Sequence, residues 1–147
     1  MKKRHFDVET DGFYGAYWKC KTDSDCAMIA MIGDDSEDYL ARTSVKWLHK
    51  LGVNVMTMSP GKKDYGHHNY PLERIQKTIR WLKAHGNQKI GIVGASTTGT
   101  LALTAASYFA DIFLLPEMPV SQKVRNQPGA LSLACSLEKR NGFHVHK

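Results

Sequence analysis

The sequence has few cysteines and no long apolar run, and these absences exclude several classes of protein. Its three cysteines, Cys20, Cys26 and Cys135, have no C-x-x-C spacing, so neither a metal site nor a disulfide framework is predicted. No apolar run approaches the roughly 18–20 residues of a membrane-spanning helix, and no apolar segment follows the basic start MKKR. We therefore predict a cytoplasmic protein that has no membrane partner.

Motifs for nucleotides and nucleic acids are also missing. The glycines at 91, 94 and 99 do not match G-x-G-x-x-G, and no Walker lysine follows them. The net charge of +6 is compatible with a polyanionic partner, but the basic residues are scattered along the chain without an aromatic-basic motif. We predict no cofactor and no nucleic-acid partner.

Apolar segments instead alternate with segments of helical periodicity. The start, FDVETDGFYGAYWK, alternates apolar and polar residues around Asp11-Gly12 and predicts an antiparallel hairpin. Strands are predicted at 26–33, 53–59, 89–94 and 111–115, and helices at 36–51, 71–85 and 97–109. Asp35 or Ser36 is the expected cap of the first helix, and Leu40 is expected to face the core. In the third helix, the Tyr108 side chain is also expected to face the core. This order predicts an α/β fold, a three-layer sandwich around a mostly parallel sheet.

One turn between a strand and a helix has the composition of a reactive site. In KIGIVGASTTGT, Ser96 follows the apolar strand and stands two residues after Gly94, which suits the strained turn of a nucleophile elbow. Two places after the serine, where glycine is usual, the chain has Thr98. Local sequence leaves three interpretations open: an elbow, a helix cap formed by Ser96 and Thr97, and an anion site at the helix N-terminus.

With these residues in view, the segment from about 6 to 120 resembles the front half of an α/β-hydrolase. It is most similar to bacterial members of the acyl-CoA thioester hydrolase and bile-acid-CoA:amino-acid N-acyltransferase C-terminal family, related to dienelactone hydrolases. The resemblance implies a partial hydrolase domain at 1–120 and a nucleophile at Ser96. It implies an oxyanion loop at 33–35, with Thr97 and either Asp34 or Asp35 supplying backbone N–H donors. The expected substrate is a small acyl ester or thioester.

The acid and base of a catalytic triad are harder to locate. By resemblance they follow later strands, whereas residues 121–147 form an atypical tail that can hold one short helix. The internal candidates are Glu117 as the acid and His144 as the base, in the chain order Ser, acid, His. His67 and His68, in the loop after the second predicted strand of the parallel series, are candidates for contacting substrate.

The expected protein is therefore a truncated hydrolase-like domain with little or no turnover. Self-association through an exposed edge of the sheet is predicted with it. The alternative is a non-catalytic module, or an inactive hydrolase remnant, that binds phosphate or CoA at the Thr97 helix terminus and at Lys62 and Lys63.

Overall fold

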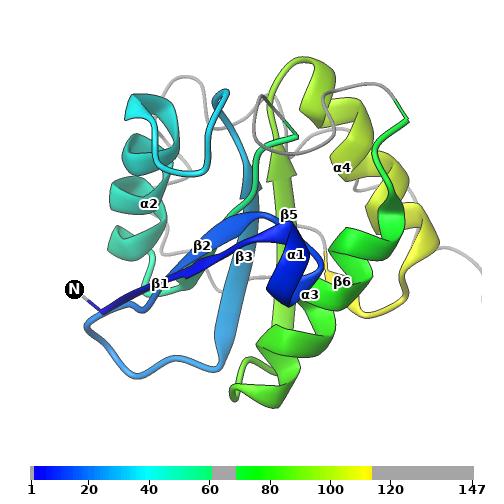
Figure 1. Ribbon diagram of the computed structural model, residues 1–147. Helices are drawn as coiled ribbons and strands as arrows, with labels where there is room; N and C mark the ends of the chain where they lie inside the picture. The colour runs from blue at the N-terminus through cyan, green and yellow to red at the C-terminus, as the bar shows by residue number, and fades with distance from the viewer. Residues whose placement is uncertain (1, 61–68, 114–147) are drawn as a thin grey trace, which may run out of the picture. The chain divides into compact units, whose positions relative to one another are not determined.

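A computed structural model describes residues 2–60 and 69–113 of the chain, in which strands and helices alternate (Figure 1). The elements in chain order are β1 (Lys3–Phe6), α1 (Val8–Asp11), β2 (Gly15–Trp18), β3 (Cys26–Met31), α2 (Tyr39–Lys50), β4 (Asn54–Thr57), α3 (Leu72–Ala84), β5 (Lys89–Gly94), α4 (Thr97–Tyr108) and β6 (Ile112–Phe113). The predicted α/β class is confirmed for this part of the chain.

The six strands form one mixed sheet in the order β1-β2-β4-β3-β5-β6. The predicted antiparallel pairing at the N-terminus is confirmed by β1 and β2, but the predicted bounds are wrong: the first strand ends at Phe6, and residues 8–11, expected in a strand, form α1. β2 also pairs antiparallel with β4, whereas β4, β3, β5 and β6 are parallel neighbours. The parallel strands lie side by side, so their carboxyl ends share one edge of the sheet.

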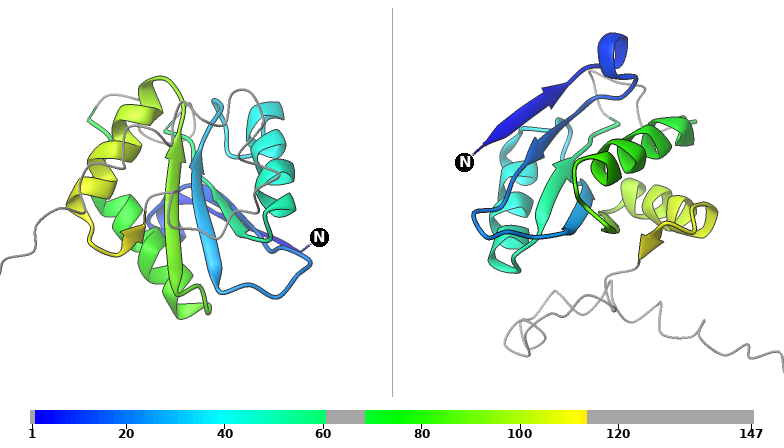
Figure 2. Two further views of the ribbon diagram at one scale, coloured as in Figure 1. Left: turned by 180° about the vertical axis from the view of Figure 1, so that it is seen from behind. Right: turned by 90° about the horizontal axis from the view of Figure 1, so that it is seen from below.

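Helices cover both faces of this sheet. Seen from below, α2 lies on one side of the strands, and α3 and α4 lie on the other (Figure 2). Ile29 and Ile92 belong to a buried cluster with Ile75 of α3 and Ala105 of α4. The intervening Met28 of β3 is also buried, and side-chain alternation places it on the opposite face. Continuous apolar strands are expected where helices cover both faces.

The start of α2 differs from the prediction. The helix begins at Tyr39, and its cap is Asp38, whose carboxylate accepts a hydrogen bond from the Ala41 N–H. The predicted caps were wrong: Ser36 is buried, and its carbonyl oxygen accepts a hydrogen bond from the Thr57 hydroxyl. The buried stripe of the helix consists of Ala41, Ser44, Val45 and Leu48.

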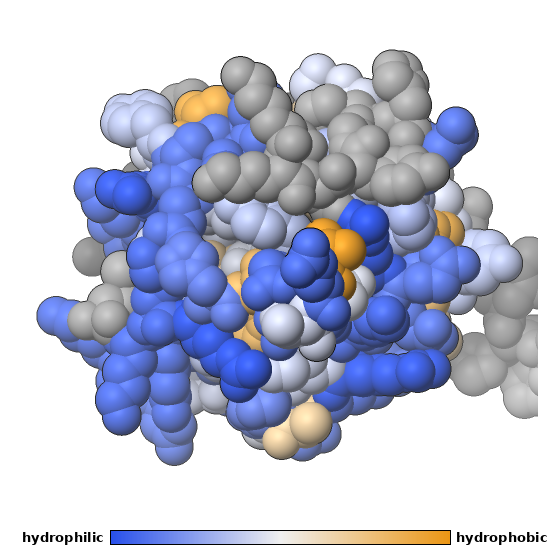
Figure 3. Space-filling view, in the orientation of Figure 1, coloured by the Kyte–Doolittle hydropathy of each residue, from blue (hydrophilic) through white to orange (hydrophobic). Residues whose placement is uncertain are grey.

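Two side chains expected in the core are exposed. Leu40 is 53% exposed and Tyr108 is 75% exposed. Leu40 stands in the first turn of α2 and Tyr108 in the last turn of α4, each outside the buried residues of its helix. The surface over α2 is predominantly hydrophilic in the view of Figure 3.

The chain divides into two units, residues 1–113 and 114–147. The second unit lies outside the described residues, so the boundary at 120 and the short helix in the tail stay predictions. In the described part of the chain, no helix has the length and apolar character needed to cross a membrane.

Candidate active site

Ser96 occupies a strained turn at the carboxyl edge of the sheet. It stands two residues after the end of β5 and directly before the first residue of α4, and its side chain is exposed. Its backbone angles are φ 57° and ψ −123°. L-residues rarely adopt this region, and holding one there costs of the order of 1–3 kcal/mol. The fold around the turn must therefore impose this conformation.

Gly94 makes the turn possible. A Cβ atom at this position would lie 2.5 Å from the carbonyl carbon of Thr98 and 2.9 Å from the backbone nitrogen of Gly99. Both are backbone atoms of the first turn of α4 and cannot rotate away. Only glycine fits where the strand turns this closely into the helix.

Thr98 holds the turn from inside. Its side chain is 4% exposed, and its hydroxyl accepts a hydrogen bond from the Ala95 N–H at 3.0 Å. The same hydroxyl lies 2.5 Å from the carbonyl oxygen of Met31 and 2.8 Å from that of Ala95, to either of which it can donate. A threonine where an elbow usually has glycine thus joins α4 to β5 and to the end of β3.

Ser96 does not cap α4. Its side chain makes no capping hydrogen bond, and its φ and ψ differ from the extended values of an ordinary cap residue. Within the described residues, the Ser96 hydroxyl has no hydrogen-bond partner. The interpretation of the Ser96 side chain as a helix cap is therefore wrong, and the residue is exposed.

The first backbone donor of α4 lies next to this hydroxyl. Considering residues 2–60 and 69–113 alone, the Thr97 N–H has no acceptor, whereas the next two N–H groups donate to the Ala95 and Ser96 carbonyls. The helix dipole adds positive potential at the same end. An anionic oxygen close to Ser96 can accept a hydrogen bond from Thr97.

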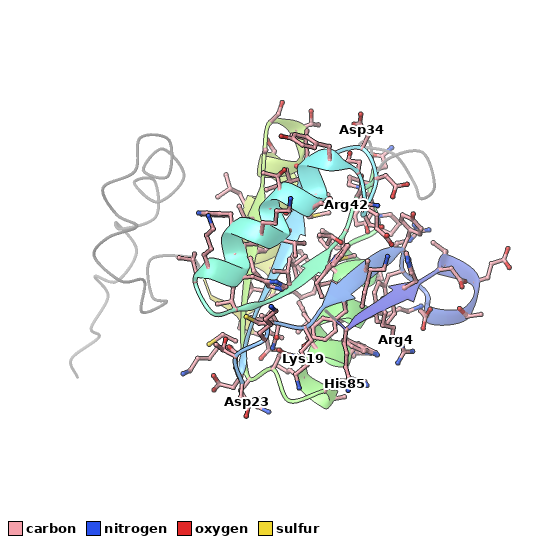
Figure 4. The ribbon with its side chains drawn as sticks, turned by 90° about the vertical axis from the view of Figure 1, so that its left-hand side faces the viewer. Arg4, Lys19, Asp23, Asp34, Arg42 and His85 are labelled. Atoms are coloured by element: carbon pink, nitrogen blue, oxygen red, sulfur yellow. The ribbon has the colours of Figure 1, made fainter. Side chains whose placement is uncertain are left out.

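The loop after β3 supplies no second free donor at the predicted position. The Asp34 N–H donates to the Asp38 carboxylate at 2.7 Å, and the Asp35 N–H donates to the same oxygen at 3.3 Å. The oxyanion role of Asp34 stays a prediction, and it would require this hydrogen bond to be exchanged. Figure 4 shows Asp34 at the outer end of its loop, where its side chain is exposed.

Asp38 organises this loop. Burial by itself would raise the pKa of the Asp38 carboxyl, but hydrogen bonds from the N–H groups of Ala41, Asp34 and Asp35 outweigh burial and lower the pKa below its ordinary value. Gly33, at φ 96°, lies so close that a Cβ atom would overlap the carboxylate. The loop therefore wraps around an ionised cap.

Two further contacts fix the same loop to its neighbours. The Tyr14 hydroxyl, from the connection before β2, lies 3.2 Å from both carboxylate oxygens of Asp35. The Ser59 hydroxyl, after β4, donates to the Gly33 carbonyl oxygen at 3.0 Å. Sequence reasoning did not identify Tyr14, Ser59 or Asp38, because each acts through a partner in the folded loop.

Tyr70 is a further residue at the start of α3 that the sequence did not single out. Its side chain is buried, and its hydroxyl has no hydrogen-bond partner within the described residues. Burial raises the pKa of the Tyr70 phenol well above its ordinary value. A neutral phenol is therefore held in the core just before α3.

The remaining predicted site residues lie outside the described residues. These are His67, His68, Glu117 and His144, together with Lys62 and Lys63. The three described histidines have other contacts: His5 with the Glu37 carboxylate, His49 with the Trp18 carbonyl, and His85 with the Trp81 carbonyl. None of the three forms a hydrogen bond with Ser96.

Comparison of the chain with protein-family models, with curated proteins and with solved structures finds no match.

Proposed function

We propose that this chain is a serine-hydrolase-like domain, related to acyl ester and thioester hydrolases or acyltransferases, with Ser96 as its nucleophile. The observation that supports the proposal best is the conformation of Ser96. Its strained backbone places an exposed serine, whose hydroxyl has no hydrogen bond within the described part of the chain, between a buried strand and a helix N-terminus. Strain of this kind persists where it serves a function, and here it presents the hydroxyl at the carboxyl edge of the sheet.

The chemistry would be acyl transfer through a covalent intermediate. The Ser96 oxygen attacks the acyl carbonyl carbon, its proton leaves to a base, and the oxyanion accepts a hydrogen bond from the Thr97 N–H. Collapse of the tetrahedral adduct breaks the bond to the leaving thiolate or alkoxide. Water or an amine then releases the acyl group from Ser96.

The rate of this reaction depends on the base. A serine hydroxyl at its ordinary pKa is a weak nucleophile. No histidine or carboxylate bonds to Ser96 within residues 2–60 and 69–113, and the candidates Glu117 and His144 lie outside them. We therefore propose that the domain acylates slowly and turns over little.

A fluorophosphonate probe tests the nucleophile directly. Such a probe phosphonylates activated serine hydroxyls and displaces fluoride. We expect labelling of the wild-type chain to be lost in Ser96→Ala and retained in Ser107→Ala, because Ser107 is an exposed serine in the same helix with a hydroxyl that donates to the Thr104 carbonyl. Equal labelling of wild type and Ser96→Ala would exclude Ser96 as the nucleophile.

The second candidate function is a non-catalytic module that binds an anionic group. The Thr97 N–H, at the start of a 12-residue helix and without an acceptor among the residues that the structure describes, favours it. This function predicts no labelling by the probe, together with binding of phosphate or CoA that is sensitive to changes at Lys62 and Lys63. The two functions thus predict opposite results in the labelling experiment with the fluorophosphonate probe.

Self-association through the sheet edge also stays a proposal. In the described sheet, β1 and β6 are the outermost strands, and each has one neighbour. An unpaired strand edge can hydrogen-bond to a second copy of the chain. Light scattering at two protein concentrations measures this, and a monomer at both concentrations would contradict it.

A further inference from the structure

A groove far from Ser96 in the sequence runs between α2 and the N-terminal strands. It has a volume of about 700 Å³ and is partly open to solvent. Its lining residues come from β1, from β2 and the segment that follows it, and from α2: Lys3, Trp18, Cys20, Lys21, Thr22, Arg42, Val45, Lys46, His49 and Lys50. None of them belongs to the loops around Ser96.

Positive charge is concentrated around this groove. Five of its ten lining residues are lysine or arginine. Lys3 pairs with the Glu37 carboxylate at 2.6 Å. The other four are Lys21, Arg42, Lys46 and Lys50, and none has an ion-pair partner among residues 2–60 and 69–113. The groove therefore has an uncompensated charge that favours a ligand with several negative charges.

Three of these cations form a row on α2. Arg42, Lys46 and Lys50 are spaced four residues apart, so they lie on one face of the helix. The row extends about 12 Å from first to last at the helical rise per residue. Figure 4 looks onto α2 and labels Arg42 at one end of this row. All three side chains are exposed and free to reach a ligand.

The base of the groove is apolar and fixed. Trp18, Cys20 and Val45 are nearly buried, at 7%, 8% and 1% exposure. The Trp18 indole N–H donates to the Thr57 hydroxyl at 2.9 Å, which fixes the ring. The aliphatic stems of the lysines add apolar surface to the walls. An organic group can therefore lie against the base while its charged groups reach the row on α2.

We propose that this groove binds a small organic ligand that carries two or more phosphate groups. The volume is within the range of sites for small molecules, about 300–1,000 Å³. The four cations without an ion pair in the described part of the chain match a multiply charged ligand better than a single carboxylate, since each charge-assisted contact needs its own partner. The concave, apolar base fits a compact organic body. This proposal does not depend on the function of Ser96.

The sequence alone does not show this site. Lys3, Lys21 and the α2 row are spread over 48 positions, from 3 to 50, and they resemble an ordinary charged surface. The fold brings them together because β1 and β2 pair beside β4, the strand against which α2 packs. Basic residues that are scattered along the sequence therefore lie together around one groove in the folded chain.

Isothermal titration calorimetry with the full chain and ATP, in EDTA and without divalent cations, tests the proposal. We expect ATP to bind with one site per chain and adenosine not to bind detectably. Tripolyphosphate, which lacks an organic body, should bind more weakly than ATP. The affinity for ATP should fall as salt rises above about 0.1 M, where the Debye length is about 10 Å.

A pair of matched variants locates the site. Lys46→Gln/Lys50→Gln removes two charges from the groove, and Lys77→Gln/Arg80→Gln removes two exposed charges from α3, so each lowers the net charge of +6 to +4. Glutamine retains helix propensity. The groove variant should bind ATP at least about tenfold more weakly, and the α3 variant should bind within about twofold of wild type. Circular dichroism checks that both remain folded.

Several results would overturn the proposal. They are no binding of ATP to the wild-type chain, equal weakening in the two double variants, tripolyphosphate binding as tightly as ATP, and tighter binding of a polyglutamate peptide than of ATP. Equal weakening would mean that net charge alone attracts the anion. Preference for the peptide would identify an acidic protein segment as the partner.

Discussion

The hydroxyl oxygen of Thr98 lies 2.5 Å from the carbonyl oxygen of Met31, and this contact joins the first turn of α4 to the end of β3. The two residues are 67 positions apart in the chain. The serine turn between β5 and α4 is therefore held by the neighbouring strand as well as by its own backbone. The candidate active site thus depends on the packing of the parallel strands.

Replacement of Thr98 by valine tests this contact. Valine has nearly the same shape but lacks the hydroxyl, so the part-buried Ala95 N–H and the buried Met31 carbonyl lose a partner. We expect Thr98→Val to lower the free energy of unfolding by about 1–3 kcal/mol. Chemical denaturation measures it. Thr98→Ser retains the hydroxyl and should cost less than Thr98→Val, and equal losses would show that the hydrogen bonds contribute little.

Two glycines near the turn should respond oppositely to alanine. A Cβ atom at Gly94 would overlap backbone atoms of Thr98 and Gly99, whereas one at Gly99 would lie 3.6 Å from the Gly94 carbonyl oxygen, an ordinary contact. We expect Gly94→Ala to destabilise by about 1–3 kcal/mol or more. Gly99→Ala should be neutral or stabilise by up to about 1 kcal/mol, because alanine favours helix. Thermal unfolding of the two variants compares them, and similar melting temperatures would contradict the tight approach at Gly94.

The strain at Ser96 can be measured by relieving it. Glycine adopts φ 57° and ψ −123° far more readily than serine. Ser96→Gly should therefore stabilise the domain by about 1 kcal/mol, a gain reduced by the greater freedom of glycine in the unfolded chain. Ser96→Ala retains a Cβ atom and should leave stability nearly unchanged. A Ser96→Gly variant no more stable than Ser96→Ala would argue against strain at this position.

The Asp38 cap predicts a pH-dependent stability. The pKa of Asp38 is lowered in the folded chain, so its ionised form stabilises the fold above the unfolded pKa of about 3.9. That contribution is lost as pH falls through the lower folded pKa. We expect Asp38→Asn to cost about 1 kcal/mol at pH 7, typical of a weakened cap, and to cost less near pH 3. Urea unfolding at both pH values measures the difference.

An exposed aspartate provides the control for this experiment. Asp23 precedes β3 and is exposed. Asp23→Asn should change stability by less than about 0.5 kcal/mol at either pH. If the cost of Asp38→Asn were the same at pH 3 and pH 7, the ionised carboxylate would not be the stabilising form.

Much of the fold is readable from local patterns. The buried strands β3 and β5 are almost continuous runs of apolar residues, and α3 repeats its apolar residues at helical spacing. The stripe of Ile75, Ile79 and Leu82 is buried as periodicity predicts. These elements are predictable because strands and helices covered by other layers need apolar residues at fixed intervals.

The site was predictable only in part. Gly94 indicates the turn, because it stands two residues before Ser96 at the point where a strand passes into a helix. The two backbones approach so closely there that no Cβ atom fits. The cap of α2 was not predictable, since Asp35, Ser36 and Asp38 are all suitable residue types within four positions. The path of the loop decided among them by turning the Asp34 and Asp35 N–H groups toward Asp38.

By itself, the amino-acid sequence determined the buried strands β3 and β5, the apolar stripe of α3, and the glycine that precedes the serine turn. Only the tertiary structure decided the contact of Thr98 with Met31, the engagement of the Asp34 N–H, and the gathering of cations beside α2. The physical reason is the separation in sequence over which each kind of interaction acts. Periodicity and steric fit act between near neighbours in the chain, whereas hydrogen bonds and charges act between whichever groups the strand order places together.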